Sequence, residues 1–219
     1  MNILAFDTSS PLLALALQQG DQVRVLHETA PKEQAHILLP RIDQLLSEAS
    51  LRVAQLDAIA FGAGPGSFTG TRIASSVAQG MGFAAHLPVI RLSSLAVMAQ
   101  AAFLAHRFRK LLLALDARMG EVYTAYYEIN AKDEAVLVGK ERVYPLDALP
   151  RIARCHDYYA VGDAWKINAP RLIHSLGEAP KAIHPDQPPT GEALLVLARS
   201  LFEQKKWGTA SQAVPNYLR

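Results

Sequence analysis

Ile3-Leu4-Ala5-Phe6-Asp7 and Leu111-Leu112-Leu113-Ala114-Leu115-Asp116 are two apolar stretches that each end in an aspartate. Each stretch has the character of a buried strand, and each is followed by a turn and then by a second strand-like segment. The two aspartates lie about half the chain length apart. This repeat predicts an α/β protein built from two copies of a strand-rich unit with helices. A coincidence of two hydrophobic strands that end in Asp is the alternative that the pattern leaves open.

The remaining periodicity predicts elements around each of these strands. In the first half we expect further strands at 12–17, 23–28, 57–61 and 88–92, and in the second half at 121–128, 135–143 and 158–161. Helices are expected at 35–49, after the glycine-rich loop at 62–70, near 146–154 and at 192–204. The expected division is an N-terminal subdomain at 1–105 and a C-terminal subdomain at 106–219.

The composition limits the class of protein. Half of the 219 residues are hydrophobic and 19% are charged, which excludes disorder over most of the length and suggests that a partner covers some apolar surface. The formal net charge of +2 does not indicate a protein that holds nucleic acid mainly through its own phosphate contacts. One cysteine, Cys155, excludes an internal disulfide and a thiolate metal cluster, and it fits a reducing compartment.

Neither a signal peptide nor a membrane span is expected. The N-terminus has no basic leader, and its apolar run ends at Asp7. The uncharged run between Arg72 and Arg91 is interrupted by serines, glycines and Pro88, so that a buried helix followed by a strand explains it better than a membrane segment. We therefore expect a cytoplasmic protein.

The glycine-rich loop Gly62-Ala63-Gly64-Pro65-Gly66-Ser67-Phe68-Thr69-Gly70 stands between a predicted buried strand and a predicted helix. It is not a Walker loop, because no Gly-Lys-Ser/Thr follows, and it lacks the third glycine of a dinucleotide fingerprint. A rigid strand-to-helix turn is therefore favoured over a phosphate cradle. Arg72 lies in the first turn of the helix, where the helix dipole disfavours a cation, and this suggests that Arg72 meets an acid or a phosphate.

Two neighbouring helices carry a candidate interaction surface. Ser76, Gly80 and Ala84 are four residues apart and form a strip of small side chains that a second helix could approach closely. Packing on the protein's own sheet is the alternative for this strip. In the preceding helix, Pro40 removes a hydrogen bond to the carbonyl of His36. His36 has no second metal ligand at helical spacing, which favours a solvated or interface histidine.

Asp7 and Asp116 end buried strands, where catalytic or magnesium-positioning acids are found in α/β sheets. The alternative is that Asp7 caps a turn with Ser9 or Ser10, and that Asp116 pairs with Arg118. The basic run 106–110 is read as a solvated helix end, with a weak RNA contact as the alternative.

Five segments together resemble the TsaB family, also called YeaZ, over nearly the whole chain. They are Ile3-Leu4-Ala5-Phe6-Asp7-Thr8-Ser9, His36-Ile37-Leu38-Leu39-Pro40, Gly64-Pro65-Gly66-Ser67-Phe68-Thr69-Gly70-Thr71-Arg72-Ile73, Asp116-Ala117-Arg118-Met119-Gly120-Glu121-Val122-Tyr123 and Pro215-Asn216-Tyr217-Leu218-Arg219. The family pattern has leucine at Thr71 and glycine at Ala74, so this sequence departs from it within the interface helix.

The resemblance implies the duplicated ribonuclease-H-like or actin-like ATPase fold of sugar kinases and chaperone ATPases, an α/β fold with two subdomains of mixed sheet and helices. It implies a non-catalytic subunit, without metal or cofactor of its own, for making threonylcarbamoyladenosine next to the anticodon of ANN-reading tRNAs. The implied partners are a TsaD-type transferase, which uses a His-x-x-x-His metal pair, a TsaE-type ATPase subunit and, when alone, a second copy. Lys32 and His36 stand where that metal pair would lie, so the pair is incomplete.

The expected partner interface lies on the two helices. It comprises His36, Leu39, Arg72, Ser76, Gln79, Gly80 and Phe83. Contact with tRNA is expected only through the partner, and a nucleotide at the shared interface is left open. The alternative function is an independent ATP-binding phosphotransferase or ATPase that uses Asp7 and Asp116. A peptidase is disfavoured, since the sequence offers neither a nucleophile with a base nor a metal site.

Overall fold

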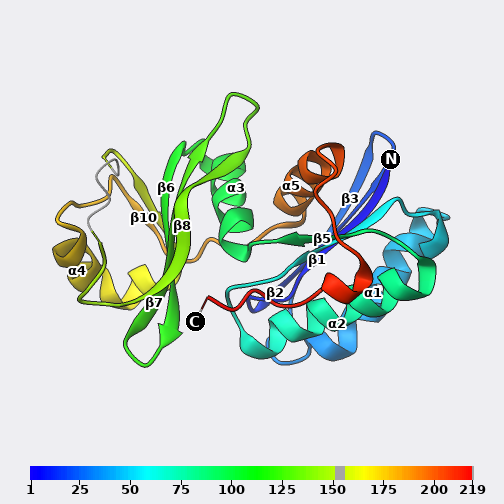
Figure 1. Ribbon diagram of the computed structural model, residues 1–219, viewed down its shortest axis with the longest axis horizontal. Coiled ribbons are helices and arrows are strands. Elements are labelled where there is room, and N and C mark those ends of the chain that lie inside the picture. Colours follow the sequence, from blue (N-terminus) through cyan, green and yellow to red (C-terminus); the bar gives the residue numbers. More distant parts are fainter. Residues whose placement is uncertain (151–155, 219) are drawn as a thin grey trace. The chain divides into compact units, whose positions relative to one another are not determined.

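The computed structural model describes residues 1–150 and 156–218, which divide into two compact units. The first unit comprises Met1–Val97 and Pro189–Asn216, and the second comprises Met98–Pro188 with the residues from Tyr217 onward. Figure 1 shows each unit as a sheet with helices packed against it. None of the described helices is long and apolar enough to cross a membrane.

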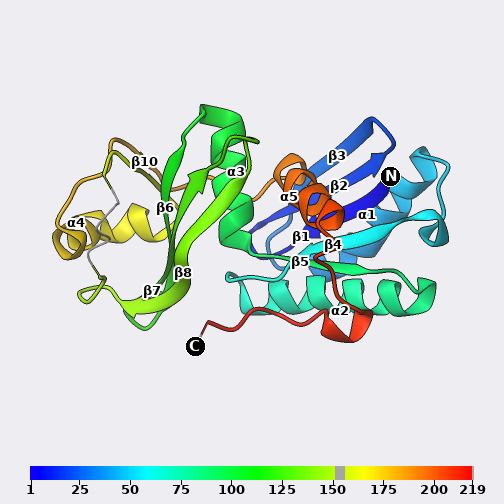
Figure 2. The same ribbon diagram turned by 45° about the horizontal axis from the view of Figure 1, so that its top comes forward.

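The sheet of the first unit has five strands in the order β3-β2-β1-β4-β5. The strands are β1 (Asn2–Asp7), β2 (Leu12–Gln19), β3 (Gln22–Thr29), β4 (Ala58–Gly62) and β5 (Val89–Leu92). The first three form an antiparallel meander, and β4 and β5 run parallel to β1. Helices α1 (Gln34–Glu48) and α2 (Phe68–Ala85) cover one face, and α5 (Gly191–Glu203) covers the other, as Figures 1 and 2 show.

The core of this unit forms because helices cover both faces of its sheet. Ile3, Leu4, Ala5 and Phe6 of β1 have no exposed surface, because side chains on both sides of the central strand meet helices. A strand that is covered on both faces reads as a continuous apolar run, which is why β1 was recognisable in the sequence.

The second unit repeats the arrangement. Its sheet has the order β10-β9-β6-β7-β8, with β6 in the place of β1, an antiparallel meander from β6 to β8, and two strands parallel to β6 on the other side. The strands are β6 (Lys110–Arg118), β7 (Glu121–Ile129), β8 (Ala135–Pro145), β9 (Tyr159–Val161) and β10 (Ile183–His184). Helix α4 (Ala164–Leu176) packs on β6. The duplication predicted from the two Asp-ending strands is confirmed.

The division of the chain differs from the expected boundary at 105/106. Residues 189–216 return to the first unit, because the apolar side of α5 packs on β1 and β2, and the amide of Gly191 donates to Nε2 of His27 at 2.9 Å. Helix α3 (Ser94–His106) was expected only through its end, since the run 106–110 was interpreted as a helix end, and the boundary between the two units falls within it, after Val97. The helix expected near 146–154 is absent from residues 146–150, which form a turn and irregular chain. Residues 151–154 of this expected helix, together with Cys155 and Arg219, lie outside the described residues.

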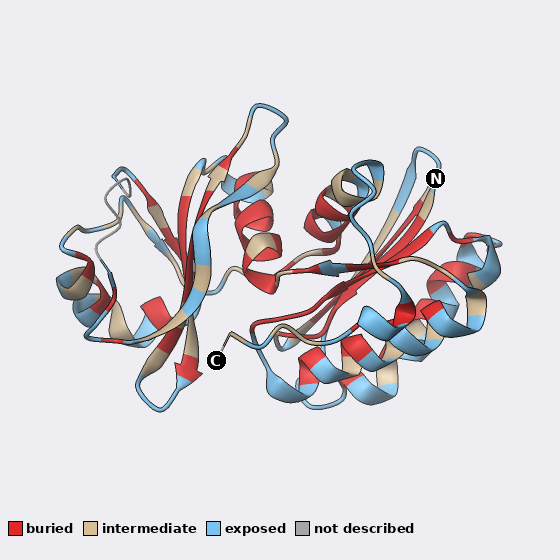
Figure 3. Cartoon of the chain, viewed as in Figure 1, coloured by how far each residue is buried: buried red, intermediate tan, exposed pale blue. Residues whose placement is uncertain are grey.

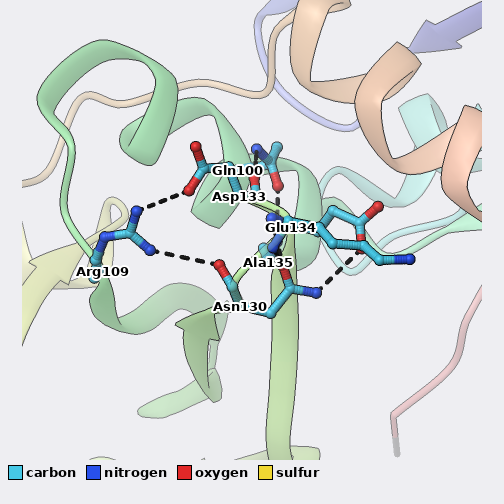
Figure 4. Close-up of polar contacts among 7 residues, drawn as sticks. Gln100, Arg109, Asn130, Asp133, Glu134 and Ala135 are labelled. Carbon is cyan, nitrogen blue, oxygen red and sulfur yellow. Dashed lines mark hydrogen bonds and ion pairs between the residues drawn. The ribbon is translucent and has the colours of Figure 1, made fainter.

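A buried amide ties α3 to the turn between β7 and β8. The side chain of Gln100 is fully buried; its Nε2 donates to the carbonyl of Asp133 at 2.9 Å, and its Oε1 accepts from the amide of Ala135 at 2.8 Å (Figure 4). Arg109 pairs with the Asp133 carboxylate at 2.8 Å, and Asn130 Oδ1 accepts from the amide of Glu134 at 3.0 Å. Gln100 thus satisfies backbone groups that no strand ladder reaches.

Replacing Gln100 with leucine is expected to lower the free energy of unfolding by about 2–4 kcal/mol. The volume is nearly kept, but a partly buried carbonyl and amide lose the partner that the fully buried Gln100 side chain provides. Urea denaturation measures the change, and Lys132→Gln, at an exposed position on the same turn, serves as the control with an effect below about 0.5 kcal/mol. A Gln100→Leu protein as stable as the control would show that the bridge contributes nothing.

Candidate partner-binding surface

The start of α2 is fixed by contacts between the end of β1 and the glycine-rich loop. The amide of Ser67 donates to the carbonyl of Ser9 at 2.7 Å, and the hydroxyl of Thr8 donates to the carbonyl of Gly70 at 2.6 Å. Ser67 is also the N-cap of α2, since its hydroxyl accepts from the amide of Gly70 at 3.2 Å. The helix therefore begins at a position set by β1.

Glycine is required in this loop because the two backbones nearly touch. A Cβ atom at Gly70 would lie 1.8 Å from the carbonyl oxygen of Thr8, and one at Gly66 would lie 2.6 Å from that of Ser9. A Cβ at Gly62 would lie 1.8 Å from Oδ2 of Asp7. Real side chains do not fit at such distances, so the glycines serve close packing within the chain. The sequence-based interpretation as a rigid strand-to-helix turn is consistent with this geometry.

Two sides of α2 are covered by the chain itself. Ala74, Ala78 and Gly82 are buried, and a Cβ at Gly82 would come within 2.7 Å of Val89 in β5. The C-terminal segment lies along another side (Figure 2). The hydroxyl of Ser75 donates to the carbonyl of Ala213, and the amide of Asn216 donates to the carbonyl of Ala63. The strip of small residues that meets the sheet is therefore distinct from the strip predicted at Ser76, Gly80 and Ala84.

The remaining side of α2 and the neighbouring side of α1 face outward, as Figure 3 shows. We call this surface the α1–α2 face; it comprises the seven expected interface residues His36, Leu39, Arg72, Ser76, Gln79, Gly80 and Phe83, together with Phe68. All of them are exposed, with Phe83 at 76%, Phe68 at 62% and Leu39 at 53%. A Cβ at Gly80 would meet no atom within 4 Å. The seven residues are thus all exposed, and the two helices that carry them contact each other.

The guanidinium of Arg72 lies over an aromatic ring. Its guanidinium carbon is 3.5 Å from the centroid of Phe68, one helical turn earlier, in a cation–π arrangement. The sequence suggested an acid or phosphate as a partner of Arg72, which stays a prediction, and it missed Phe68. The spacing of four residues on one helix is the signal that would have found this pair. The stacking holds both side chains in place on the α1–α2 face.

The two strand-ending aspartates have partners within their own units. Asp7 is fully buried; its carboxylate accepts from the amide of Ser9 at 2.6 Å and from the hydroxyl of Ser94 at 2.9 Å. Burial raises the pKa of Asp7, and the hydrogen bonds from Ser9 and Ser94 oppose this shift.

Asp116 accepts from the amide of Arg118 at 2.8 Å and pairs with its guanidinium at 3.1 Å. The turn cap on Ser9 and the pairing with Arg118 were the structural alternatives for these residues, and both are present. Among residues 1–150 and 156–218, no group of three His, Cys, Asp or Glu side chains is placed to hold a metal ion.

The duplicated units define the class of protein, which is an α/β protein of the actin-like ATPase fold. The ROK hexokinase of Thermus thermophilus has the same fold. It is 11% identical to this chain and aligns over 93% of this chain and 100% of the hexokinase with a TM-score of 0.50. The family model described as "TsaD: tRNA N6-adenosine threonylcarbamoyltransferase" matches residues 24–171.

Curated relatives identify the family more specifically than the fold does. The chain is 45% identical to the tRNA threonylcarbamoyladenosine biosynthesis protein TsaB of Haemophilus influenzae, over 100% of this chain and 94% of that protein, and 33% identical to TsaB of Escherichia coli, over 100% and 95%. YeaZ from Pseudomonas aeruginosa is 35% identical and superimposes with a TM-score of 0.91 over 99% of both chains. The chain belongs to the TsaB (YeaZ) family, which confirms the resemblance carried by the five segments.

Two alanine substitutions in α2 are expected to have opposite effects. Gly70→Ala should lower the free energy of unfolding by at least about 2 kcal/mol, because the new methyl group overlaps the carbonyl of Thr8. Gly80→Ala should raise it by up to about 1 kcal/mol, because alanine favours a helix and nothing obstructs it. Thermal and urea unfolding measure both changes, and equal effects of the two substitutions would contradict the close contact of the loop with β1.

The raised pKa of Asp7 predicts a pH-dependent difference in stability from an Asp7→Asn variant. The folded-state pKa of this carboxyl lies above its unfolded value, so its contribution is fully present below the unfolded pKa and is lost as the pH rises through the folded pKa. The wild-type protein should therefore gain stability relative to Asp7→Asn as the pH falls from about 7 to about 4. Urea denaturation across this range is the measurement, and a relative loss of stability on acidification would refute the desolvation argument.

Proposed function

We propose that this chain is a non-catalytic subunit for the biosynthesis of threonylcarbamoyladenosine in tRNA, and that it binds and stabilises a TsaD-type transferase through the α1–α2 face. The pathway follows from the names of its curated TsaB relatives. The observation that carries the mode of action is the uncovered surface on α1 and α2, where Phe83, Phe68 and Leu39 are each more than half exposed.

The chemistry of the α1–α2 face suits a helix-to-helix contact with another subunit. Large apolar side chains at Leu39, Phe68 and Phe83 would lose contact with water, and the open space over Gly80 allows a partner backbone to come close. Arg72, already stacked on Phe68, adds a planar donor that is common at protein interfaces. The surface therefore combines apolar anchors with a gap into which a partner side chain can insert.

Sequence similarity supports a TsaD-type subunit as the occupant. The TsaD family model matches 24–171, a range that contains both α1 and α2, so a TsaD-type chain is expected to carry equivalent helices. Two chains of the same fold can pair through the same helices about an approximate two-fold axis, as identical chains do in an isologous dimer. The same reasoning predicts that this chain pairs with a second copy of itself through the α1–α2 face when the transferase is absent.

Three features support a role without chemistry of its own. Lys32 occupies the position where the metal pair implied by the resemblance would need a histidine four residues before His36. The Asp7 carboxylate is enclosed by Ser9 and Ser94, and Asp116 is engaged by Arg118. The proposal assigns the transfer step to the partner, a further place in the assembly to a TsaE-type ATPase, and contact with tRNA to the partner. It places the protein in the cytoplasm, without a cofactor of its own.

Gly80→Arg is expected to weaken the complex with a TsaD-type subunit at least about 100-fold. The arginine side chain fills the gap that a partner helix needs, and the fold stays intact because no atom lies within 4 Å of the new Cβ. Gln204→Arg adds the same side chain at the C-cap of α5, on the opposite face of the sheet, and is the matched control. Isothermal titration of each variant against the partner gives the affinities, and circular dichroism checks the fold.

Sedimentation of each protein alone provides a second readout. The wild-type chain and Gln204→Arg should form dimers, and Gly80→Arg should be a monomer. A folded Gly80→Arg protein that binds the transferase as tightly as the control would reject the α1–α2 face as the interface.

A further inference from the structure

The second unit contains a pocket that the partner-binding surface does not use. It has a volume of about 330 Å³ and lies over β7 and β8, at the edge of the layer formed by α4 and residues 146–150. This volume falls in the range of pockets that hold small molecules. We call it the β7–β8 pocket. Because the α1–α2 face belongs to the first unit, the two surfaces can be tested separately.

A bulge between β7 and β8 shapes the pocket. Thr124 is paired with Arg142 and Tyr126 with Val138, so that one residue of β7 lies opposite three residues of β8. Gly139 stands in the bulge with φ of +90°, in the left-handed region that favours glycine. Bulges of this kind reorient side chains and are frequent beside binding sites. Two cationic residues of β8, Lys140 and Arg142, lie at this bulge and line the pocket.

The charges that line the pocket have one sign. Lys140 and Arg142 both contribute to its lining, and none of the described residues of that lining is an aspartate or glutamate. Glu141, between them, is not part of the lining, and its carboxylate accepts from the hydroxyl of Tyr127. Within the described part of the chain, neither Lys140 nor Arg142 forms an ion pair. Two unneutralised cations at one pocket favour an anionic ligand, and the fork of arginine suits a phosphate.

The other walls are apolar and aromatic. Leu149, Leu176 and Tyr126 are buried residues of the core that border the pocket, and Tyr144, which is partly exposed, is the more accessible aromatic residue of its lining. The hydroxyl of Tyr126 donates to Glu128 at 3.2 Å, which fixes the position of this ring. Aromatic walls accept a flat base by stacking, which is largely independent of the base. The pocket therefore offers a place for a ring next to a place for a negative charge.

We propose that the β7–β8 pocket binds a nucleoside phosphate, with the base against Tyr144 and the neighbouring leucines and the phosphate at Lys140 and Arg142. The same chemistry is presented by a free mononucleotide and by a nucleotide of an RNA strand. The proposal does not depend on the partner-binding function, because every described residue that lines the pocket belongs to the second unit of this chain.

Isothermal titration of the full chain tests it, with AMP, UMP, adenosine and inorganic phosphate as probes. AMP and UMP should bind at least tenfold more tightly than adenosine or phosphate, because only they engage both parts of the pocket. The double variant Lys140→Gln/Arg142→Gln should weaken AMP binding at least tenfold. Lys132→Gln removes one exposed cation from the turn between β7 and β8 and should leave AMP binding unchanged. Both altered cations are exposed, and thermal unfolding verifies that the double variant folds.

A five-nucleotide RNA with a 5′-phosphate distinguishes the two sources. RNA binding that AMP displaces would support the proposal with a strand as the source, and AMP binding that the RNA does not displace would support it with a free nucleotide. Absence of binding by AMP, UMP and the RNA at millimolar concentration would overturn the proposal. So would AMP binding that the double variant leaves unchanged.

Discussion

The contact between the end of β1 and the glycine-rich loop is the constraint on which the first unit depends. Thr8 and Ser9 touch the backbone of Gly66 and Gly70 at distances that leave no room for a side chain. These contacts determine where α2 begins and how it is rotated about its axis. Its small buried residues then meet the sheet and the C-terminal segment, and the side that carries Gly80 is left facing outward.

Much of the fold was predictable because its central strands are covered on both faces. The apolar runs that end at Asp7 and Asp116 are visible without alignment, and their similarity correctly indicates the duplication. The range of helix α3 was not predicted, although its end near His106 was, because Ser94–His106 is apolar around nearly its whole circumference and no 3.6-residue period stands out. The return of α5 to the first sheet was missed because proximity along the chain does not specify which of two similar sheets a helix covers.

The candidate surface could be predicted only in part from the sequence. The spacing of Ser76, Gly80 and Ala84 marks a strip of small residues, but periodicity alone cannot tell which of two such strips on α2 is buried; the space around Gly80 and Gly82 decides this. The β7–β8 pocket gave no sequence signal. It depends on a bulge that changes the strand pairing around Gly139, and pairing is a property of the folded sheet.

Hydrogen exchange of the chain, with and without a TsaD-type transferase, tests most directly whether α1 and α2 form the subunit interface. The account predicts slower exchange confined mainly to peptides from 34–48 and 68–85 when the transferase is bound, with α5 and the second sheet unchanged. Slower exchange elsewhere, with both of these helices exchanging as in the free protein, would contradict it.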